Sequence, residues 1–285
     1  MTRRRPSSPS ARRPARPSAK APAKPTTRKR SPRKPPARNP RTARASRRAP
    51  RPIVTVVLFD LDDTLYDCFG QRVVAAHRNA SHALAAAGLP ASADQILKLR
   101  LAAMEADPRQ EFVDLEVSRQ LGVPLSDTLR ETSQAAYFST PVGRLHLFPG
   151  ALALLRYLKR RGVRNFIVSF GDPQTQRAKV AALGLEGEPA VENIFYADLA
   201  QLLSKEDFFR SILHAVESDP ARVLVVGDRP ASEIRAGKGL GMRTVRLRHG
   251  EFSRQEPEGE AERADFEIRK IAALRKLPFH FGPRR

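Results

Sequence analysis

Three aspartates stand within four residues, at Asp60, Asp62 and Asp63, directly after the apolar run 53–59. If the chain stays extended past Asp60, the side chains of Asp60 and Asp62 project to the same side, and that of Asp63 does not. Two adjacent carboxylates repel each other unless a cation or a shared proton separates them. Such a pair could ligate a hard cation through oxygen, or could divide into a nucleophile and a proton donor. The alternative is an acidic loop without chemistry, which three aspartates in four residues make the weaker interpretation.

A hydroxyl and a glycine follow a second apolar run. Ser169 ends the run 165–169, and Gly171 comes two residues later. The Ser169 hydroxyl and nearby backbone N–H groups could hold phosphoryl oxygens, with Gly171 allowing the backbone a close approach. Ser-x-Gly-Asp is also a common turn, so this segment predicts a substrate-binding site only in combination with the aspartates.

Two more acidic residues, Asp228 and Glu233, follow the run 222–227. In open α/β sheets, ligands bind beyond the carboxyl ends of the strands, where these residues would meet Asp60 and Asp62. Four carboxylates at one sheet edge would be electrostatically costly without a cation. Mg²⁺ prefers oxygen ligands completed by waters and a phosphate. We therefore expect Mg²⁺ as the cofactor.

A lysine at an unusual position completes the set. Ser204-x-x-Asp207 resembles a capping box ahead of the predicted helix 206–217. This motif puts Lys205 in the first helical turn, where the helix dipole disfavours a cation by about 0.3–1 kcal/mol. Lys205 could serve to bind an anion, or could be an ordinary solvated lysine. Lys179 is the rival, but it lies inside another predicted helix, away from a strand end.

The elements that must position these residues alternate along the chain. Strands are predicted at 53–59, 165–169 and 222–227, with weaker candidates at 193–197, 243–247 and 264–268. Helices are predicted at 150–162, 173–183, 206–217 and 231–240. This alternation predicts an α/β fold with a doubly wound, mostly parallel, Rossmann-like sheet. Residues 70–140 contain no convincing strand and fit four helices, which predicts a helical insertion after the first strand.

The sequence resembles the haloacid dehalogenase superfamily over residues 53–272, in the branch with a helical cap after the first strand. The motifs that carry the resemblance are Asp60-Leu61-Asp62-Asp63-Thr64, Ser169, Lys205, and Gly227-Asp228 with Glu233. Phe148-Pro149-Gly150 and Leu183-Gly184-Leu185 are also similar to the superfamily's usual sequence. The chain departs from it at Glu206, where a proline is usual, and at Glu233, where aspartate is commoner.

The resemblance implies a Mg²⁺-dependent phosphatase acting on a small phosphorylated metabolite. Asp60 would be the nucleophile that forms an aspartyl-phosphate, and Asp62 the general acid/base. Asp60, the backbone carbonyl of Asp62 and Asp228 would hold the metal, while Glu233 would orient its shell. Ser169, Gly171 and Lys205 would bind the phosphoryl group. The family's dehalogenases lack an acid at the position of Asp62, so its presence favours phosphoryl chemistry. A phosphomutase remains an alternative.

The composition and the resemblance together predict three parts: a basic tail at 1–52, a core at 53–67 and 141–285, and a cap at 68–140. Nineteen of the 51 Lys and Arg residues lie in the tail, which holds no acidic residue and 12 of the 24 prolines. The rest of the chain has 32 basic and 30 acidic residues, a net charge of +2 against +21 for the whole. Such a tail cannot form a core and is predicted to be disordered.

The tail leaves a second function class open. An extended polycation could bind nucleic acid or another polyanion without sequence preference, or could be a low-complexity extension without function.

No apolar segment approaches the roughly 18–20 residues that cross a bilayer, and the single cysteine, Cys68, permits no intramolecular disulfide. The protein is therefore expected in the cytoplasm. In the cap, Arg72, His77, Arg78 and Arg100 could meet an anionic substrate or lie on solvated helix faces.

Overall fold

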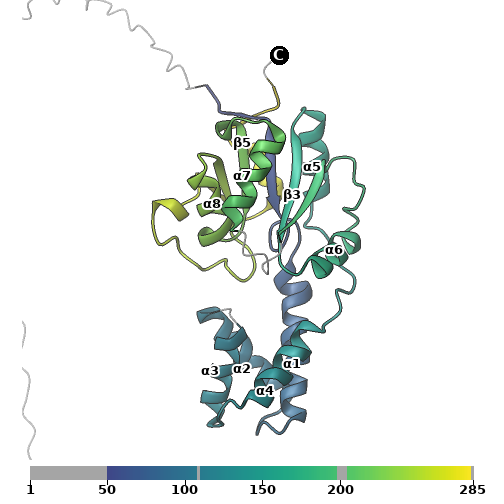
Figure 1. The fold of residues 1–285 in the computed structure, drawn as a ribbon, viewed down its shortest axis with the longest axis vertical. Helices are drawn as coiled ribbons and strands as arrows, with labels where there is room; N and C mark the ends of the chain where they lie inside the picture. The colour runs from purple at the N-terminus through teal and green to yellow at the C-terminus, as the bar shows by residue number, and fades with distance from the viewer. Residues whose placement is uncertain (1–49, 108–109, 198–203, 284–285) are drawn as a thin grey trace, which may run out of the picture. The chain divides into compact units, whose positions relative to one another are not determined.

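The computed structural model describes residues 50–107, 110–197 and 204–283, and the predicted tail lies outside them except for its last three residues. Six parallel strands form the main sheet in the order β4-β3-β2-β5-β6-β7 (Figure 1). The strands are β2 (Val56–Asp60), β3 (Arg164–Phe170), β4 (Asn193–Ala197), β5 (Val223–Gly227), β6 (Arg243–Leu247) and β7 (Phe266–Ile268). After β2 the chain builds the sheet first to one side and then to the other. The prediction of a doubly wound parallel sheet is confirmed.

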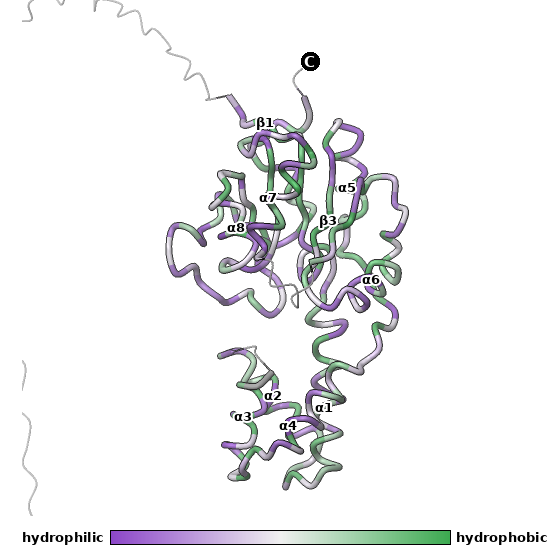
Figure 2. The backbone as a smooth tube through the Cα atoms, in the orientation of Figure 1, coloured by the Kyte–Doolittle hydropathy of each residue, from purple (hydrophilic) through white to green (hydrophobic). Residues whose placement is uncertain are grey.

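Helices cover both faces of this sheet because the central strands are apolar on both sides. Val57 and Phe59 of β2 belong to the hydrophobic cluster that includes α5 (Ala151–Arg160) and α6 (Pro173–Ala182). The alternate residues Val56 and Leu58 pack in the cluster of α7 (Lys205–Val216) and α8 (Arg235–Gly239). Such two-sided burial explains the continuous apolar run in the sequence. Figure 2 shows the contrast between the largely hydrophobic β3 and the hydrophilic segment that connects β6 to β7.

The predicted strand 53–59 divides at Thr55. β1 (Ile53–Val54) pairs in parallel with β8 (His280–Phe281) in a separate two-stranded sheet, and β8 was not predicted. The division has a simple cause. The neighbouring strands begin opposite Val56, which pairs with Arg164 and Val223, so the two residues before Thr55 have no partner in the main sheet.

The predicted helix 231–240 also differs in detail. It consists of a π-helical turn η4 (Pro230–Ile234) followed by α8. Short 3₁₀ segments make up η3 (Pro220–Arg222), η5 (Glu260–Glu262) and η6 (Ile271–Lys276).

The helical insertion after the first strand is confirmed. It comprises η1 (Phe69–Val73), α1 (Val74–Ala86), α2 (Ala93–Ala106), α3 (Gln110–Leu121) and α4 (Asp127–Phe138). Ser92 and Ser126 cap α2 and α4 by accepting N–H hydrogen bonds three residues ahead. Within the described residues, no helix combines the length and the apolar character needed to cross a membrane.

Candidate active site

The carboxyl ends of β2, β3 and β5 meet at one edge of the sheet. Asp60, the last residue of β2, pairs with Val168 of β3, and Phe59 pairs with Val226 of β5. The chain therefore brings Asp60 beside Ser169 and Gly227, as expected for a site at the edge of a parallel sheet.

A cavity of about 700 Å³ opens at this edge, within the size range of small-molecule sites. Its lining residues come from the sheet edge, the cap and the loop after β6: Asp60, Asp62, Asp63, Cys68, Arg72, Val73, Tyr137, Phe138, Phe170, Asp172, Gln174, Thr175, Gln176, Lys179, Lys205, Asp228, Arg229, Glu233, Glu251 and Phe252. Five of the seven predicted site residues are among them. Ser169 and Gly171 are not.

Three buried carboxylates lie together in the cavity. Asp60, Asp228 and Glu233 each offer an oxygen, and these atoms all lie within 4.8 Å of one another. Such an all-oxygen donor set fits Mg²⁺ better than metals that prefer nitrogen or sulfur. Lys205, buried at the first residue of α7, places Nζ 3.0 Å from Asp60 Oδ1 and also forms an ion pair with Glu233.

Burial and crowding set the electrostatics of this group. Burial raises the pKa of Asp60 to about 7; Lys205 opposes that rise, and Glu233 and Asp62 add to it. Burial, followed by repulsion from Glu233, raises the pKa of Asp228 well above its usual value. Burial acts on Glu233 in the same direction, but Lys205 outweighs it and the pKa of Glu233 is lowered. Ionisation of all three carboxylates would thus place more negative charge in the cluster than one lysine neutralises, and a divalent cation would relieve that condition.

Gly227 is required by the packing of Glu233. A Cβ at Gly227 would lie 2.6 Å from Glu233 Cγ, so any side chain there would displace the carboxylate. Glu233 also accepts a hydrogen bond from the Arg229 backbone N–H at 3.1 Å, which closes the turn after β5. The Gly-Asp pair and the acidic residue five positions later therefore form one packed unit.

Asp62 is held by three groups that the sequence did not identify as its partners. Lys179 Nζ lies 2.7 Å from Asp62 Oδ2, Gln176 Nε2 donates to the same oxygen at 3.3 Å, and the Tyr66 hydroxyl donates to Oδ1 at 2.7 Å. Burial opposes ionisation of Asp62, but Lys179 and these hydrogen bonds outweigh it and lower the pKa. Gln176 and Lys179 are three residues apart in α6, a spacing that puts both on one helix face. This spacing is the sequence feature from which their shared position near Asp62 could have been predicted.

Ser169 and Gly171 lie outside the lining of the cavity. Ser169 is buried in β3. Gly171 has φ +138°, and a Cβ there would lie 2.6 Å from Gln176 Nε2. The absence of a side chain at Gly171 thus lets Gln176 donate to the Phe170 carbonyl at 2.8 Å and reach Asp62.

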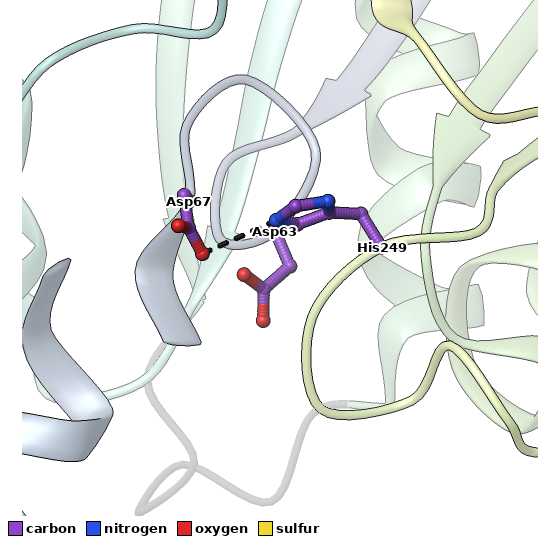
Figure 3. Close-up of side chains that lie close together, drawn as sticks. All are labelled: Asp63, Asp67 and His249. Atoms are coloured by element: carbon purple, nitrogen blue, oxygen red, sulfur yellow. Dashed lines mark hydrogen bonds and ion pairs between the residues drawn. The ribbon is translucent and has the colours of Figure 1, made fainter. Parts of the chain in front are cut away.

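Asp63 belongs to a second cluster, with Asp67 and His249 (Figure 3). Its Oδ1 accepts a hydrogen bond from the Phe69 N–H at 2.9 Å, and Asp67 Oδ1 lies 3.2 Å from His249 Nε2. Gly250, at φ +65°, lies so close that a Cβ would come within 2.1 Å of Asp63 Cγ. This cluster links the turn after β2, the start of the cap and the loop after β6.

Of the four cap cations considered from the sequence, only Arg72 lines the cavity. Arg100 is fully buried, pairs with Asp114 and donates to His77 Nδ1 at 3.1 Å and to Ser133 Oγ at 3.0 Å. Arg78 is exposed on α1. His77 and Arg100 therefore hold the cap helices together.

Comparisons with known proteins identify the family. The model of the haloacid dehalogenase-like hydrolases matches residues 54–241. The glyceraldehyde 3-phosphate phosphatase of Pyrococcus abyssi is 31% identical over 201 residues, which cover 70% of this chain and 83% of that protein. The phosphoglycolate phosphatase of Rhodospirillum rubrum is 30% identical over 121 residues, which cover 42% of this chain and 49% of that protein.

A solved structure shares the fold. The putative HAD-hydrolase YfnB from Bacillus subtilis, bound to magnesium, aligns with a TM-score of 0.55 and 20% identity. The alignment covers 79% of this chain and 99% of that one.

Proposed function

The chain belongs to the haloacid dehalogenase-like hydrolase family, and within that family we propose that it is a Mg²⁺-dependent phosphatase of small phosphomonoesters. The observation that carries the proposal is the position of Asp60. Its carboxylate stands at the end of β2, in contact with Lys205 and within 4.8 Å of oxygens of Asp228 and Glu233. A nucleophile, a cation and metal ligands thus meet at one cavity.

Asp60 attacks the phosphorus atom through a carboxylate oxygen, which forms an aspartyl-phosphate and breaks the bond to the leaving alcohol. Asp62 donates a proton to that alcohol. It then takes a proton from the water that attacks the aspartyl-phosphate, so that inorganic phosphate leaves and Asp60 is regenerated. The same two carboxylates therefore serve both halves of the reaction.

Asp60, the backbone carbonyl of Asp62 and Asp228 would hold Mg²⁺, with Glu233 orienting its shell. The ion supplies positive charge that offsets the charge of the transferring phosphoryl group. Lys205 binds the phosphoryl oxygens, and Ser169, which is buried at the end of β3 and does not line the cavity, is not assigned a direct contact with them. Lys205 is already beside the nucleophile at 3.0 Å. Gly171 takes part indirectly, by leaving room for Gln176.

The substrate is proposed to be a short phosphorylated metabolite. The curated relatives are named for glyceraldehyde 3-phosphate and phosphoglycolate, which have three and two carbons. These names favour a phosphatase over the phosphomutase alternative.

The proposal is tested by incubating the full chain with an aryl phosphate in the presence of Mg²⁺ and measuring the release of inorganic phosphate. Asp60→Asn keeps the shape of the side chain but removes its nucleophilic oxygen, so activity should fall below about 1% of wild type. The control is Asp127→Asn, an exposed aspartate on α4, which should retain full activity. Asp60→Asn protein that keeps more than a few percent of the activity would remove Asp60 from the role of nucleophile.

A further inference from the structure

Arg72 brings a positive charge into the cavity from the cap. It belongs to η1, the first turn of the cap, and lines the same cavity as Asp60. Its Nη2 donates to the Thr140 carbonyl at 3.4 Å, at the other end of the cap. Arg72 therefore lies where both cap linkers meet the site.

The other cations of the cavity are already engaged. Lys205 is paired with Asp60 and Glu233, and Lys179 with Asp62. The Arg229 guanidinium stacks over the Phe252 ring at 4.0 Å from its centroid. These contacts serve the catalytic carboxylates and the loop after β6.

Arg72 has no such partner. Its Nε is buried and makes no hydrogen bond, and its one hydrogen bond through Nη2 is long. Within the described residues it forms no ion pair with a carboxylate. A buried donor without an acceptor is costly, and neither Nε nor the long contact of Nη2 gives Arg72 a counter-charge. A guanidinium presents two parallel N–H groups, which match the two oxygens of a carboxylate.

We propose that Arg72 binds a carboxylate of the substrate, so that the enzyme prefers small phosphomonoesters that carry a carboxylate at the end remote from the phosphoryl group. This inference rests on the proposed phosphatase function and narrows its substrate class. Arg72 is then the residue that separates an acid from the corresponding alcohol or aldehyde.

An acidic residue in the same cavity affects which anionic group of a substrate Arg72 can bind. Glu251 lines the same cavity, and burial raises its pKa to about 7. The negative charge that this side chain carries near neutral pH repels an anionic substrate. A second phosphoryl group would bring about twice the charge of a carboxylate, so the site favours the carboxylate.

The test compares substrates that differ only at the remote end. 2-Phosphoglycolate is set against 2-hydroxyethyl phosphate, and 3-phosphoglycerate against glycerol 3-phosphate, with a bisphosphate as a third arm. The measurement is kcat/KM with Mg²⁺ for wild type, Arg72→Gln and Arg72→Lys. The matched control is Arg78→Gln, an exposed arginine on α1 that does not line the cavity.

Wild type should prefer the acid of each pair, and Arg72→Gln should lower the acid-to-alcohol ratio by about 10- to 100-fold, the range for hydrogen bonds to charged groups. Arg72→Lys should keep part of the preference, because it keeps the charge but not the paired donors. Arg78→Gln should leave the ratio unchanged. The ratio also serves as the control for folding, because a misfolded variant loses both substrates together.

Three results would overturn the inference: a wild type without preference for the acid, an unchanged ratio in Arg72→Gln, or a stronger preference for the bisphosphate. Asp60-dependent turnover of the alcohols in those cases would leave the phosphatase proposal intact. If no substrate were turned over, the phosphatase proposal would fail. Calorimetric binding of the acid and alcohol would then decide on Arg72, because equal affinities would overturn its role.

Discussion

Lys179 Nζ lies 2.7 Å from Asp62 Oδ2, so a lysine of α6 neutralises the residue proposed as general acid and base. The contact favours the ionised form of Asp62 and lowers its pKa, against the opposing effect of burial. Ionised Asp62 is ready to act as a base on water in the second step. In the first step it must carry a proton, and Lys179 makes that form scarce.

Replacement of Lys179 should therefore change the pH dependence of the first step. Without the lysine, only the hydrogen bonds from Tyr66 and Gln176 oppose the effect of burial, so the pKa of Asp62 rises. The protonated form then persists to higher pH, so in Lys179→Met the descending limb of kcat/KM for an alkyl phosphate should move to higher pH. Arg177→Met on the exposed face of the same helix is the control. A limb that stays in place, or moves to lower pH, would show that Lys179 does not set the protonation of Asp62.

Glu233 should govern the affinity for Mg²⁺. It lies with Asp60 and Asp228 and is oriented by Lys205 and by the Arg229 N–H. If it acts on the metal through a water, Glu233→Ala should raise the Mg²⁺ concentration for half-maximal activity by about 10- to 100-fold, as removal of such partners typically does. Asp228→Ala should do more harm. A titration curve that is the same in Glu233→Ala and wild type would assign Glu233 to holding Lys205 alone.

The sheet and the carboxylates could be predicted because each depends on a local pattern. A buried parallel strand is apolar on both faces, and Asp60 and Asp228 directly follow such strands. These patterns can be recognised in the sequence without knowing which strands pair with one another. The helical insertion followed from the absence of strand patterns over 70 residues.

The features that could not be predicted from the sequence depend on contacts between distant segments of the chain. β8 exists because β1 extends past its neighbours in the main sheet and needs a partner. Lys179 was set aside because it lies inside a predicted helix, away from a strand end, yet α6 begins at the end of β3 and turns its inner face toward Asp62. The two lysines were treated as rivals for one role. The structure gives each its own carboxylate.

Acid should destabilise the protein through His77 in the cap. Burial, and then the positive charge of Arg100, lower the pKa of His77 from 6.5 to about 3. The unfolded chain therefore takes up a proton below pH 6.5 that the folded chain refuses until about pH 3. Folding loses stability as the pH falls through this window, by about 1.4 kcal/mol for each pH unit.

This contribution can be measured by denaturant unfolding at pH 7 and pH 5. His77→Asn offers Arg100 an amide oxygen in place of Nδ1 but does not titrate, so it should lose less stability between the two pH values than wild type does, by about 2 kcal/mol. His82→Asn, at an exposed position of α1, should behave like wild type. Equal pH dependence in His77→Asn and wild type would mean that His77 is not kept neutral in the fold.

The basic tail should bind polyanions without contributing to catalysis. Residues 1–52 carry 19 positive charges and no negative ones, whereas the rest of the chain has a net charge of +2. Removal should stop at residue 49, because the Pro52 carbonyl accepts a hydrogen bond from the His280 N–H at 2.8 Å and β1 begins at Ile53. This truncation removes all of the tail's basic residues except Arg51.

The truncated protein should hydrolyse a small phosphate as wild type does, because every residue of the cavity lies after residue 49. The full chain should bind duplex DNA or RNA without sequence preference, and salt should weaken the binding steeply. Each neutralised phosphate of duplex DNA contributes about −0.9 to the log–log slope with salt. Not every charge can dock on one duplex at once, and we therefore expect a slope of about −5 to −10. Tight DNA binding by the truncated protein would locate the site on the folded domain, and a full chain that binds no polyanion at low salt would leave the tail without this function.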